Sequence, residues 1–414
     1  MASFLQQFDG AAAEARWPMV RQWIVERSLP FYAELREKRP ILTMPEVTIA
    51  ARFADCSAIL RRHDIFSVAL YEPKQGAYWM AQDDTAIHWR EKSIMRAILD
   101  REDVPKIRSY VADKAASLLS QAGAKIDAVD GLARAMPIAL VRDWFGFNDA
   151  DPKHLADWSY WNQYDAFHNQ PFDSVAVPDQ KAVENHRKAV DLLMVAYIAL
   201  LVEKRVVEDK LGKRGADPVS RLVRLSQSGA LQFDTKRVIL NAGGLLIGAV
   251  ETTSNAVINT LSYLLGHPDL LARASAAAAK DDPTEFDGYI YEALRFAPAF
   301  PYFFRTCEQP SVLAGGTEFA TEIKPRTTVL ALTHSAMFDS AAFPDPETFD
   351  PARSRADTFH FGYGLHECLG RPIAEVLIPE IVRQCLRLPN LRPDGPVVTR
   401  DGFVPLSYPV RWDA

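Results

Sequence analysis

The 414-residue sequence predicts a mainly α-helical fold with small β-sheets, and two observations lead to this prediction. Across residues 84–297, apolar side chains recur at three- and four-residue spacing, which is the pattern of amphipathic helices. Short stretches with strand character occur near residues 41–51, 302–331 and 403–411. Strands and helices do not alternate regularly along the chain, so a doubly wound α/β sheet is not expected.

The composition is that of an ordinary globular protein, with 48% hydrophobic and 24% charged residues. The net charge is −6, from 53 acidic and 47 basic residues, and it does not indicate a nucleic-acid partner. The four cysteines, Cys56, Cys307, Cys368 and Cys385, have no paired spacing, which favours a reducing compartment and gives no structural zinc motif. The N-terminus does not read as a signal peptide, and no run of about 18 uncharged apolar residues occurs. We therefore expect a soluble, cytoplasmic protein that does not bind a membrane.

The longest predicted helix runs from about Asp234 to Leu265. Asp234 is a suitable N-cap residue, and the following Gly266-His267-Pro268 is a strong stop signal. A helix of about 30 residues would be roughly 45 Å long and would cross a whole domain. Its interior contains three glycines, Gly243, Gly244 and Gly248. Each costs up to about 1 kcal/mol relative to alanine, which indicates either the close approach of a ligand or tight packing against another helix.

A glycine-rich loop carries one cysteine, and a helix-like stretch follows it at once. The loop reads Phe361-Gly362-Tyr363-Gly364-Leu365-His366-Glu367-Cys368-Leu369-Gly370. The amide donors of such a loop and the positive end of the next helix favour a thiolate at Cys368. The glycines permit left-handed dihedral angles and let the backbone approach a flat ligand. A thiolate presented in this way suits a metal ion with an open axial position.

This loop resembles the haem-binding loop of the cytochromes P450, whose soluble bacterial members share the pattern Phe-Gly-x-Gly-x-His-x-Cys-x-Gly. The six fixed positions are filled by Phe361, Gly362, Gly364, His366, Cys368 and Gly370. The resemblance implies a single cytochrome P450 domain over residues 1–414, with a long central helix over a haem. It also implies that the haem is haem b and that the thiolate of Cys368 is its axial ligand. The alternative is an incidental cysteine in a glycine-rich turn.

The predicted central helix contains Gly248-Ala249-Val250-Glu251-Thr252-Thr253, which resembles the family signature Ala/Gly-Gly-x-Asp/Glu-Thr-Thr. The resemblance implies that Thr252 binds dioxygen by a hydrogen bond and that Glu251 delivers protons from solvent. Ala249 stands where glycine is usual, and a small residue there leaves room for oxygen beside the cofactor. Glu251 and Thr252 are neighbours on a helix and point in different directions, which suits this division of roles. The alternative is an exposed glutamate beside two β-branched residues that bend the helix.

Other segments resemble the scaffold and the cofactor clamps of the same family. Glu292 and Arg295 match Glu-x-x-Arg and share a helix face, with Arg353 as the candidate third partner. A plain surface ion pair is the alternative. The residues expected to bind the haem propionates are His88, Lys92, Arg305 and His366. Lys92 occupies a position where the family has arginine, and Arg96, one turn further, could take its place.

The resemblance also places aromatic side chains around a substrate pocket; the candidates are Trp79, Phe167, Phe300, Phe303 and Phe403. Core packing is the alternative for each of them. The implied function is that of a monooxygenase that uses O2 to oxidise a lipophilic or aromatic small molecule. Its electrons would come from a separate [2Fe-2S] ferredoxin and reductase. A peroxygenase driven by H2O2, a haem-binding sensor without turnover and a cysteine-nucleophile enzyme are the alternatives; Glu251 and Thr252 argue against the peroxygenase.

Overall fold

The computed structural model describes residues 2–99, 101–229 and 231–413. These residues form two compact units, and each unit is described by itself. Unit 1 comprises Met1–His88 and Tyr291–Cys368, and unit 2 comprises Trp89–Ile290 and Leu369–Ala414. Within the described ranges, no helix combines the length and the apolar composition that crossing a membrane would require.

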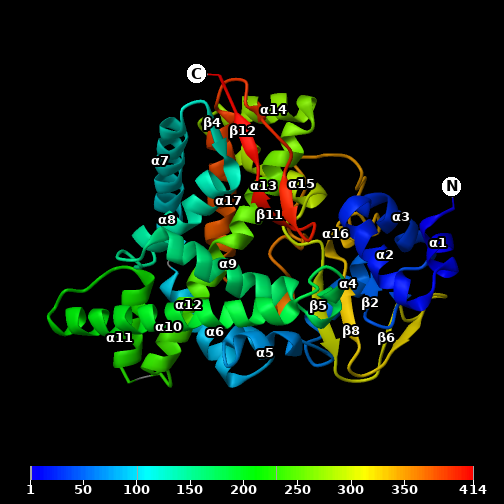
Figure 1. Cartoon of the computed structure of the whole chain (residues 1–414), viewed down its shortest axis with the longest axis horizontal. Helices are drawn as coiled ribbons and strands as arrows, with labels where there is room; N and C mark the ends of the chain where they lie inside the picture. Colours follow the sequence, from blue (N-terminus) through cyan, green and yellow to red (C-terminus); the bar gives the residue numbers. More distant parts are fainter. Residues whose placement is uncertain (1, 100, 230, 414) are drawn as a thin grey trace. The chain divides into compact units, whose positions relative to one another are not determined.

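Unit 1 contains a five-stranded sheet with the order β1-β2-β8-β5-β3. Its strands are β1 (Ile41–Thr43), β2 (Thr48–Ala50), β3 (Phe66–Ser67), β5 (Phe303–Cys307) and β8 (Thr328–Ala331). β2 and β8 pair in parallel, with Ile49 opposite Leu330, and the other neighbours are antiparallel. Figure 1 shows β2 and β8 side by side, although they are far apart in the sequence. A separate antiparallel pair joins β6 (Ser311–Leu313) and β7 (Thr321–Ile323).

Helices of unit 1 share a hydrophobic core with this sheet. The helices of this unit are α1 (Phe4–Gly10), α2 (Ala13–Glu26), α3 (Ser28–Lys38), α4 (Phe53–Arg61), α5 (Glu72–Gln75) and α16 (Thr333–Ala336). α4 has an apolar face because Cys56, Ile59 and Leu60 recur at helical spacing, and this face joins a core that includes Phe359. Tyr363 of the cysteine loop packs against the same core, which supports the loop from within unit 1.

Unit 2 is mainly helical. Its helices are α7 (Val104–Ala122), α8 (Ala135–Asp143), α9 (Pro152–His168), α10 (Gln180–Lys210), α11 (Pro218–Gln227), α12 (Thr235–Ala249), α13 (Glu251–Leu265), α14 (Pro268–Ala278) and α17 (Arg371–Leu386), with a π-helical segment at Val129–Arg134. Two more helices, α6 (Ala86–Ile98) and α15 (Thr284–Phe296), run through the positions where the chain divides. Short 3-10 turns lie at Arg101–Asp103 and Pro171–Val175 in unit 2, and at Ala69–Tyr71, Trp79–Ala81 and Gly364–His366 in unit 1.

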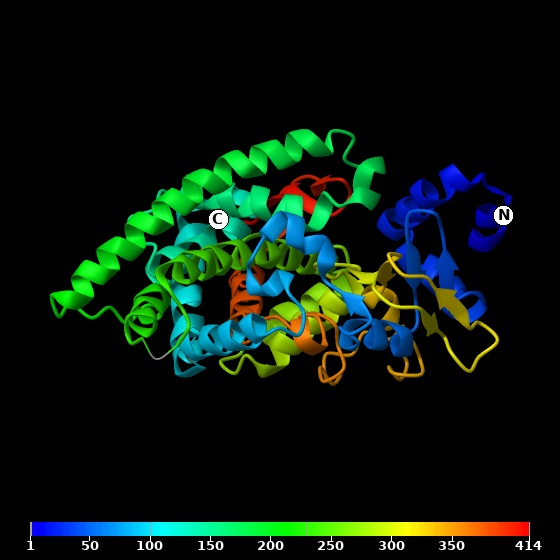
Figure 2. The ribbon, with the colours of Figure 1, turned by 90° about the horizontal axis from the view of Figure 1, so that it is seen from below.

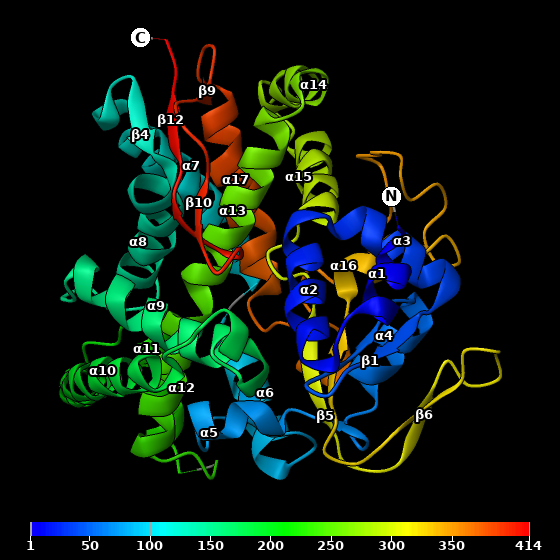
Figure 3. The same cartoon turned by 45° about the vertical axis from the view of Figure 1, so that its right-hand side comes forward.

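Two small antiparallel sheets complete unit 2. One has the order β4-β12-β9, with β4 (Lys125–Asp127), β9 (Arg392–Pro393) and β12 (Pro409–Arg411). The other is the hairpin of β10 (Val398–Arg400) and β11 (Val404–Ser407). Figure 3 shows β12 beside β4. The sequence predicted the β-content near residues 403–411, but the short strands β4 and β9 were not predicted.

The prediction of a single helix from Asp234 to Leu265 is wrong in one respect, because the structure has two helices there, α12 and α13, separated at Val250. The predicted ends are correct: the Asp234 side chain accepts a hydrogen bond from the N–H of Arg237 at 2.9 Å, and α13 ends at Leu265. At the break, the Thr252 hydroxyl donates to the carbonyl oxygen of Gly248 at 2.8 Å. A side-chain bond to the carbonyl four residues earlier competes with the backbone ladder and bends helices.

Two of the helix glycines have different surroundings. A Cβ on Gly243 would lie 3.6 Å from side-chain atoms of Ile198 and Met194 on α10, so this glycine allows close helix packing. Apart from its chain neighbours and the backbone of its own helix, a Cβ on Gly248 would meet no atom of the described residues within 4 Å. Helix packing therefore explains Gly243, whereas the space beside Gly248 is open and the close approach of a ligand there stays a prediction.

Candidate active site

The cysteine loop ends unit 1. Cys368 is exposed, and its N–H donates to the carbonyl oxygen of Phe361 at 2.8 Å, which closes the loop. Gly362 and Gly364 both have φ of +72°, in the left-handed region that favours glycine. A Cβ on Gly364 would also lie 2.8 Å from the carbonyl oxygen of Leu60, too close for any side chain. The expected left-handed glycines are therefore present at these two positions.

The two ends of the loop are fixed in different ways. The ring of Phe361 is half-buried, with its centroid 6.3 Å from that of Tyr291. Gly370 has φ of −79°, which any residue can adopt, and it is the N-cap residue of α17. α17 begins three positions after Cys368 in the sequence, as the loop pattern predicted.

Three of the predicted propionate-binding residues gather in unit 1. The rings of His88 and His366 meet edge to face with their centroids 5.1 Å apart. Nδ1 of His88 donates to the carbonyl oxygens of Trp79 and Gln82, at 3.1 and 2.9 Å, and these two bonds fix the orientation of the buried ring. Arg305 lies close enough to this pair for its charge to lower the pKa of His366.

Arg305 on β5 is a buried cation with little compensation from the protein. Its guanidinium donates to the carbonyl oxygen of the adjacent Phe304 at 2.8 Å, and within the described part of the chain it forms no ion pair. Burial lowers the pKa of Arg305, and the nearby Tyr71 and Asp83 oppose this shift. Burying an ion costs several kcal/mol unless an opposite charge compensates it. An anionic group of a ligand would supply that charge, so Arg305 fits a haem propionate.

His366 is held by Asp83, a residue that the sequence did not indicate. Nε2 of His366 lies 3.1 Å from Oδ1 of Asp83, and the other oxygen of Asp83 accepts the N–H of Val68 at 3.0 Å. Burial lowers the pKa of His366 to about 4; the bond to Asp83 opposes this shift. Nδ1 of His366 is buried and has no hydrogen-bond partner among the described residues, so a ligand could bond to it.

Lys92 lies one turn after His88 on α6 and is only 3% exposed, whereas Arg96 lies on the exposed side of the helix. Burial therefore favours Lys92 over Arg96 as a partner for a buried anion. The adjacent Glu91 is fully buried, and Arg237 donates to its two carboxylate oxygens at 2.5 and 2.6 Å. This ion pair fixes α6 to the beginning of α12.

Glu251 at the start of α13 is buried, and Arg134 holds its carboxylate. Nε of Arg134 donates to both carboxylate oxygens at 3.0 Å. Burial raises the pKa of Glu251, and the charge of Arg134 opposes this shift. Arg134 also binds Asp130 at 2.8 Å and donates to the carbonyl oxygen of Pro405 at 3.0 Å. Because the Asp130 side chain is 72% exposed, these charged groups link a buried acid to solvent.

Arg134 and Asp130 were not predicted from the sequence. They lie four positions apart in the π-helical segment, a geometry that is frequent at functional sites. In the sequence, an aspartate and an arginine at this spacing look like a surface pair. Arg134 is 117 positions away from Glu251, so no local pattern could have connected them.

Thr252 and Ala249 lie on either side of the break in the central helix, and both are half-buried. The Thr252 hydroxyl donates to the Gly248 carbonyl oxygen, and its lone pairs can still accept a hydrogen bond. The space beside Gly248 is open, as described above. A small diatomic ligand would find a hydroxyl and free volume at this position.

Glu292, Arg295 and Arg353 come together in unit 1. Arg295 donates to the two carboxylate oxygens of Glu292 at 3.0 and 2.7 Å, and Arg353 donates to one of them at 3.2 Å. Arg295 has no exposed surface and also donates to the carbonyl oxygens of Met337 and Thr348. The structure thus brings together the three residues that the sequence grouped, as a buried network and not as a surface pair.

The predicted pocket aromatics have different surroundings. Trp79 is fully buried and packs edge-on against His88 at 5.2 Å, which favours a supporting role over lining an open pocket. In unit 1, the half-buried rings of Phe300 and Phe303 have centroids 6.2 Å apart. In unit 2, the half-buried Phe403 stacks on His168 of α9 at 6.3 Å. Phe167, on the same helix, is also half-buried. The pocket roles of the last four residues stay predictions.

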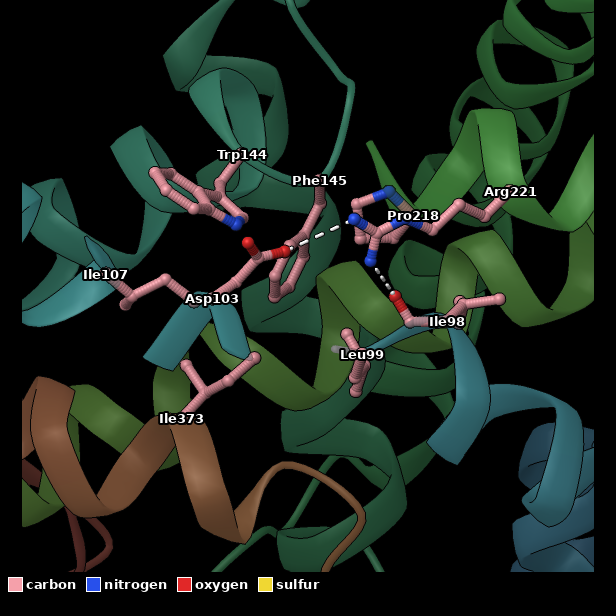
Figure 4. A pocket seen from close by; sticks show the side chains of 9 residues that line it. All are labelled: Ile98, Leu99, Asp103, Ile107, Trp144, Phe145, Pro218, Arg221 and Ile373. Carbon is pink, nitrogen blue, oxygen red and sulfur yellow. Dashed lines mark hydrogen bonds and ion pairs between the residues drawn. The ribbon is translucent and has the colours of Figure 1, made fainter. Parts of the chain in front are cut away.

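A small pocket elsewhere in unit 2 contains none of the predicted site residues (Figure 4). Its lining includes Ile98, Ile107, Phe145 and the ion pair of Asp103 with Arg221, whose atoms lie 3.2 Å apart. Its volume of about 10 Å³ would hold a single water molecule. It is therefore a packing defect and does not offer a ligand site.

Comparison with known proteins agrees with this geometry. A sequence profile of the family described as Cytochrome P450 matches residues 92–399. The cytochrome P450 monooxygenase PikC of Streptomyces venezuelae is 29% identical, over 74% of this chain and 66% of its own length, which is just under two thirds of that relative. The erythromycin C-12 hydroxylase of Saccharopolyspora erythraea is 28% identical, over 88% of this chain and 89% of its own length.

Solved structures of cytochromes P450 are similar to this chain as well. The open form of cytochrome P450 EryK from S. erythraea is 25% identical, covers 93% of this chain and 95% of its own, and has a TM-score of 0.78. CYP109E1 of Bacillus megaterium, in complex with testosterone, has a TM-score of 0.79, covers 95% of this chain and 100% of its own, and at 19% identity shows the fold alone. Since the profile spans most of the sequence, the chain belongs to the cytochrome P450 family, whose members are monooxygenases with a cysteine-ligated haem.

Proposed function

We propose that this chain activates dioxygen at a haem ligated by the thiolate of Cys368, and that it oxidises a lipophilic or aromatic small molecule. The electrons would come from a separate [2Fe-2S] ferredoxin and its reductase. The observation that carries the proposal is the polar cluster of unit 1. There, a buried Arg305 forms no ion pair among the described residues, and His366 has a buried ring nitrogen without a partner. Both groups suit an anionic propionate.

The cluster and the cysteine loop would hold the cofactor. The residues proposed to bind its propionates are Arg305, His366, His88 and Lys92. Phe361, Gly362, Gly370 and Ala249 are proposed to contact the macrocycle, because their small size or flat ring permits close approach. When bound, the haem supplies the iron at which dioxygen is activated. We further propose that residues 1–414 work as one catalytic domain.

Proton supply would depend on Glu251 and Thr252. Burial raises the pKa of Glu251, so its carboxyl group holds a proton more readily than an exposed one. Asp130 and Arg134 connect this carboxyl group to solvent, and proton transfer requires Arg134 to release one carboxylate oxygen. To pass a proton onward, the Thr252 hydroxyl would accept one on a lone pair and release the hydrogen that it donates to the Gly248 carbonyl oxygen.

The class of substrate follows from the aromatic candidates Phe167, Phe300, Phe303 and Phe403, which offer apolar contact area. Relatives whose names state a hydroxylation of erythromycin and of 6-deoxyerythronolide B support a lipophilic substrate. The residues themselves do not select one molecule within this class.

The proposed function can be tested by reconstitution. A library of lipophilic compounds is first titrated into the haem protein, and compounds that shift the iron from low to high spin are kept. Each is then incubated with a ferredoxin, its reductase and NADH, or with H2O2 alone. We expect product that depends on NADH and O2. An equal rate with H2O2 alone would favour a peroxygenase, and no product by either route would favour a sensor.

Replacing Thr252 with alanine should uncouple electron use from oxidation. Loss of a positioned proton donor typically lowers rates by about 10²-fold or more, so product per NADH should fall strongly while peroxide accumulates. The matched control is Thr252→Ser, which keeps the hydroxyl group and should keep most of the coupling. Tight coupling in Thr252→Ala would show that another group delivers the proton.

Replacing Arg305 with methionine should have opposite effects on two properties, the stability of the apoprotein and the retention of haem. The apoprotein should be as stable as the wild type or more stable, because an uncompensated buried charge is removed. Haem should dissociate faster by about tenfold or more, since a charge-assisted hydrogen bond contributes about 1.5–3 kcal/mol. Transfer of haem to an excess of apomyoglobin measures the second effect.

The control for this experiment is Arg326→Met, which changes an exposed arginine of the same unit and should alter neither property. If Arg305→Met destabilises the apoprotein and leaves haem transfer unchanged, Arg305 is a structural residue and not a propionate ligand.

A further inference from the structure

Helix α10 has two apolar faces, although a surface helix of a globular protein needs only one. The inner face includes the buried residues Val190, Met194, Ile198 and Leu201. The outer face includes Leu193, Leu200 and Val207, which are 61%, 68% and 55% exposed. Figure 2 shows α10 as the long green helix. Contiguous exposed apolar surface of this kind indicates a binding partner.

The outer face follows a strict seven-residue repeat. One position of the repeat contains His186, Leu193, Leu200 and Val207, and the other contains Ala182, Ala189, Ala196 and Glu203. All eight side chains are exposed, and we call them the outer seam. The two positions alternate by three and four residues, which is the a and d spacing of a coiled coil. The seam spans about 38 Å at 1.5 Å per residue, and its repeat is sustained over more than three heptads.

The outer seam is complementary to itself when a second copy is turned antiparallel. In the register that places Ala196 opposite Leu193 of the second copy, the same offset places Ala189 opposite Leu200. Ala182 then lies opposite Val207. Every apolar layer combines one small and one large side chain, which allows close approach without voids.

The polar residues of the outer seam favour the same antiparallel register. It brings His186 opposite Glu203 of the second copy, where a histidine can donate a hydrogen bond to a carboxylate. A parallel pair would instead place Glu203 opposite Glu203, and like charges directly opposite each other are unfavourable. A parallel pair would also place leucine on leucine and alanine on alanine, with an uneven gap between the helices.

We propose that the outer seam of α10 is the interface of a homodimer in which two copies of this chain pair antiparallel. The contact is isologous, because each copy contributes the same surface through a two-fold axis. The dimer is independent of the proposed catalytic function, since none of the seam residues is assigned to the haem or to proton delivery.

Sedimentation of the haem-loaded protein tests the interface. The wild type should show a concentration-dependent dimer, and Leu193→Lys combined with Leu200→Lys should be monomeric at the same concentrations. The matched control is Val195→Lys, which changes a residue of the same helix that is 41% exposed but lies outside the seam, and it should stay dimeric. Circular dichroism and the haem spectrum confirm that each variant is folded. A monomeric wild type, including one that binds lipid vesicles instead, would overturn the proposal.

A charge exchange tests the register. His186→Glu should weaken the dimer, because it brings two carboxylates together in two symmetric places. Adding Glu203→Lys to the same chain should restore the dimer, since each new glutamate then faces a lysine of the second copy. In a parallel pair the double variant would place like charges opposite each other at both positions. Failure of the second change to restore dimerisation would therefore overturn the antiparallel arrangement.

Discussion

Replacing Cys368 with serine is expected to abolish the red-shifted absorption band of the reduced, CO-bound protein and to reduce monooxygenase turnover by orders of magnitude. The thiolate donates electron density that favours cleavage of the O–O bond, and a serine hydroxyl does not. The exposed position of Cys368, at the end of a loop closed by its own N–H, is consistent with a ligand presented to a cofactor. Absorption spectroscopy of the dithionite-reduced protein under CO measures the band.

The control for this prediction is Cys385→Ala, which changes a buried cysteine of α17 and should leave the band in place. If Cys368→Ser retains the band, a different residue ligates the iron. If it loses the haem altogether, addition of an exogenous thiol or imidazole should recover a bound haem with a different spectrum, which still assigns the axial position to Cys368.

Replacing Arg295 with methionine should destabilise the protein by about 3–5 kcal/mol, the usual cost of removing one partner from a buried ion pair. The change leaves the buried carboxylate of Glu292 with Arg353 as its remaining cation, and it removes the donor to the carbonyl oxygens of Met337 and Thr348. Denaturant unfolding followed by tryptophan fluorescence measures the change in the free energy of unfolding.

A surface ion pair provides the contrast. Arg392 and Asp413 form an exposed ion pair, and their side chains are 41% and 49% exposed. Arg392→Met removes this pair and should lower the free energy of unfolding by no more than about 1 kcal/mol. A further substitution, Glu292→Leu in the Arg295→Met background, should recover part of the lost stability because the unpaired buried charge is gone. A loss below about 1 kcal/mol for Arg295→Met would mean that the network does not hold the fold together.

The fold class could be predicted because it depends on patterns that are local in the sequence. Apolar spacing predicted that most of residues 84–297 is helical, and the N-cap and stop signals of the central segment gave both of its ends, Asp234 and Leu265. The break at Val250 could not be predicted in the same way. At the break, the hydroxyl of Thr252 bonds to the Gly248 carbonyl oxygen, and either orientation of that side chain is compatible with the sequence.

The residues of the candidate site also fall into two groups, those that the sequence could indicate and those that it could not. Cys368, Glu292 and Arg295 belong to motifs with fixed spacing, so the sequence could indicate them. Asp83 and Arg134 belong to no motif, and each acts on a residue far away along the chain: 283 positions separate Asp83 from His366. Only the folded chain shows that these two residues hold His366 and Glu251. The aromatic pocket residues could be named but not placed, because burial of an aromatic ring has the same pattern in a core as in a pocket.

The uncompensated charge of Arg305 has a consequence for the life of the protein in a cell. If Arg305 binds a haem propionate as proposed, the chain is at its least stable before the cofactor arrives, because little else offsets this buried charge. By mass action, each tenfold rise of free haem above its dissociation constant adds about 1.4 kcal/mol to the free energy of unfolding. The abundance of this protein should therefore follow the supply of haem, with proteolysis removing the chains that were never filled.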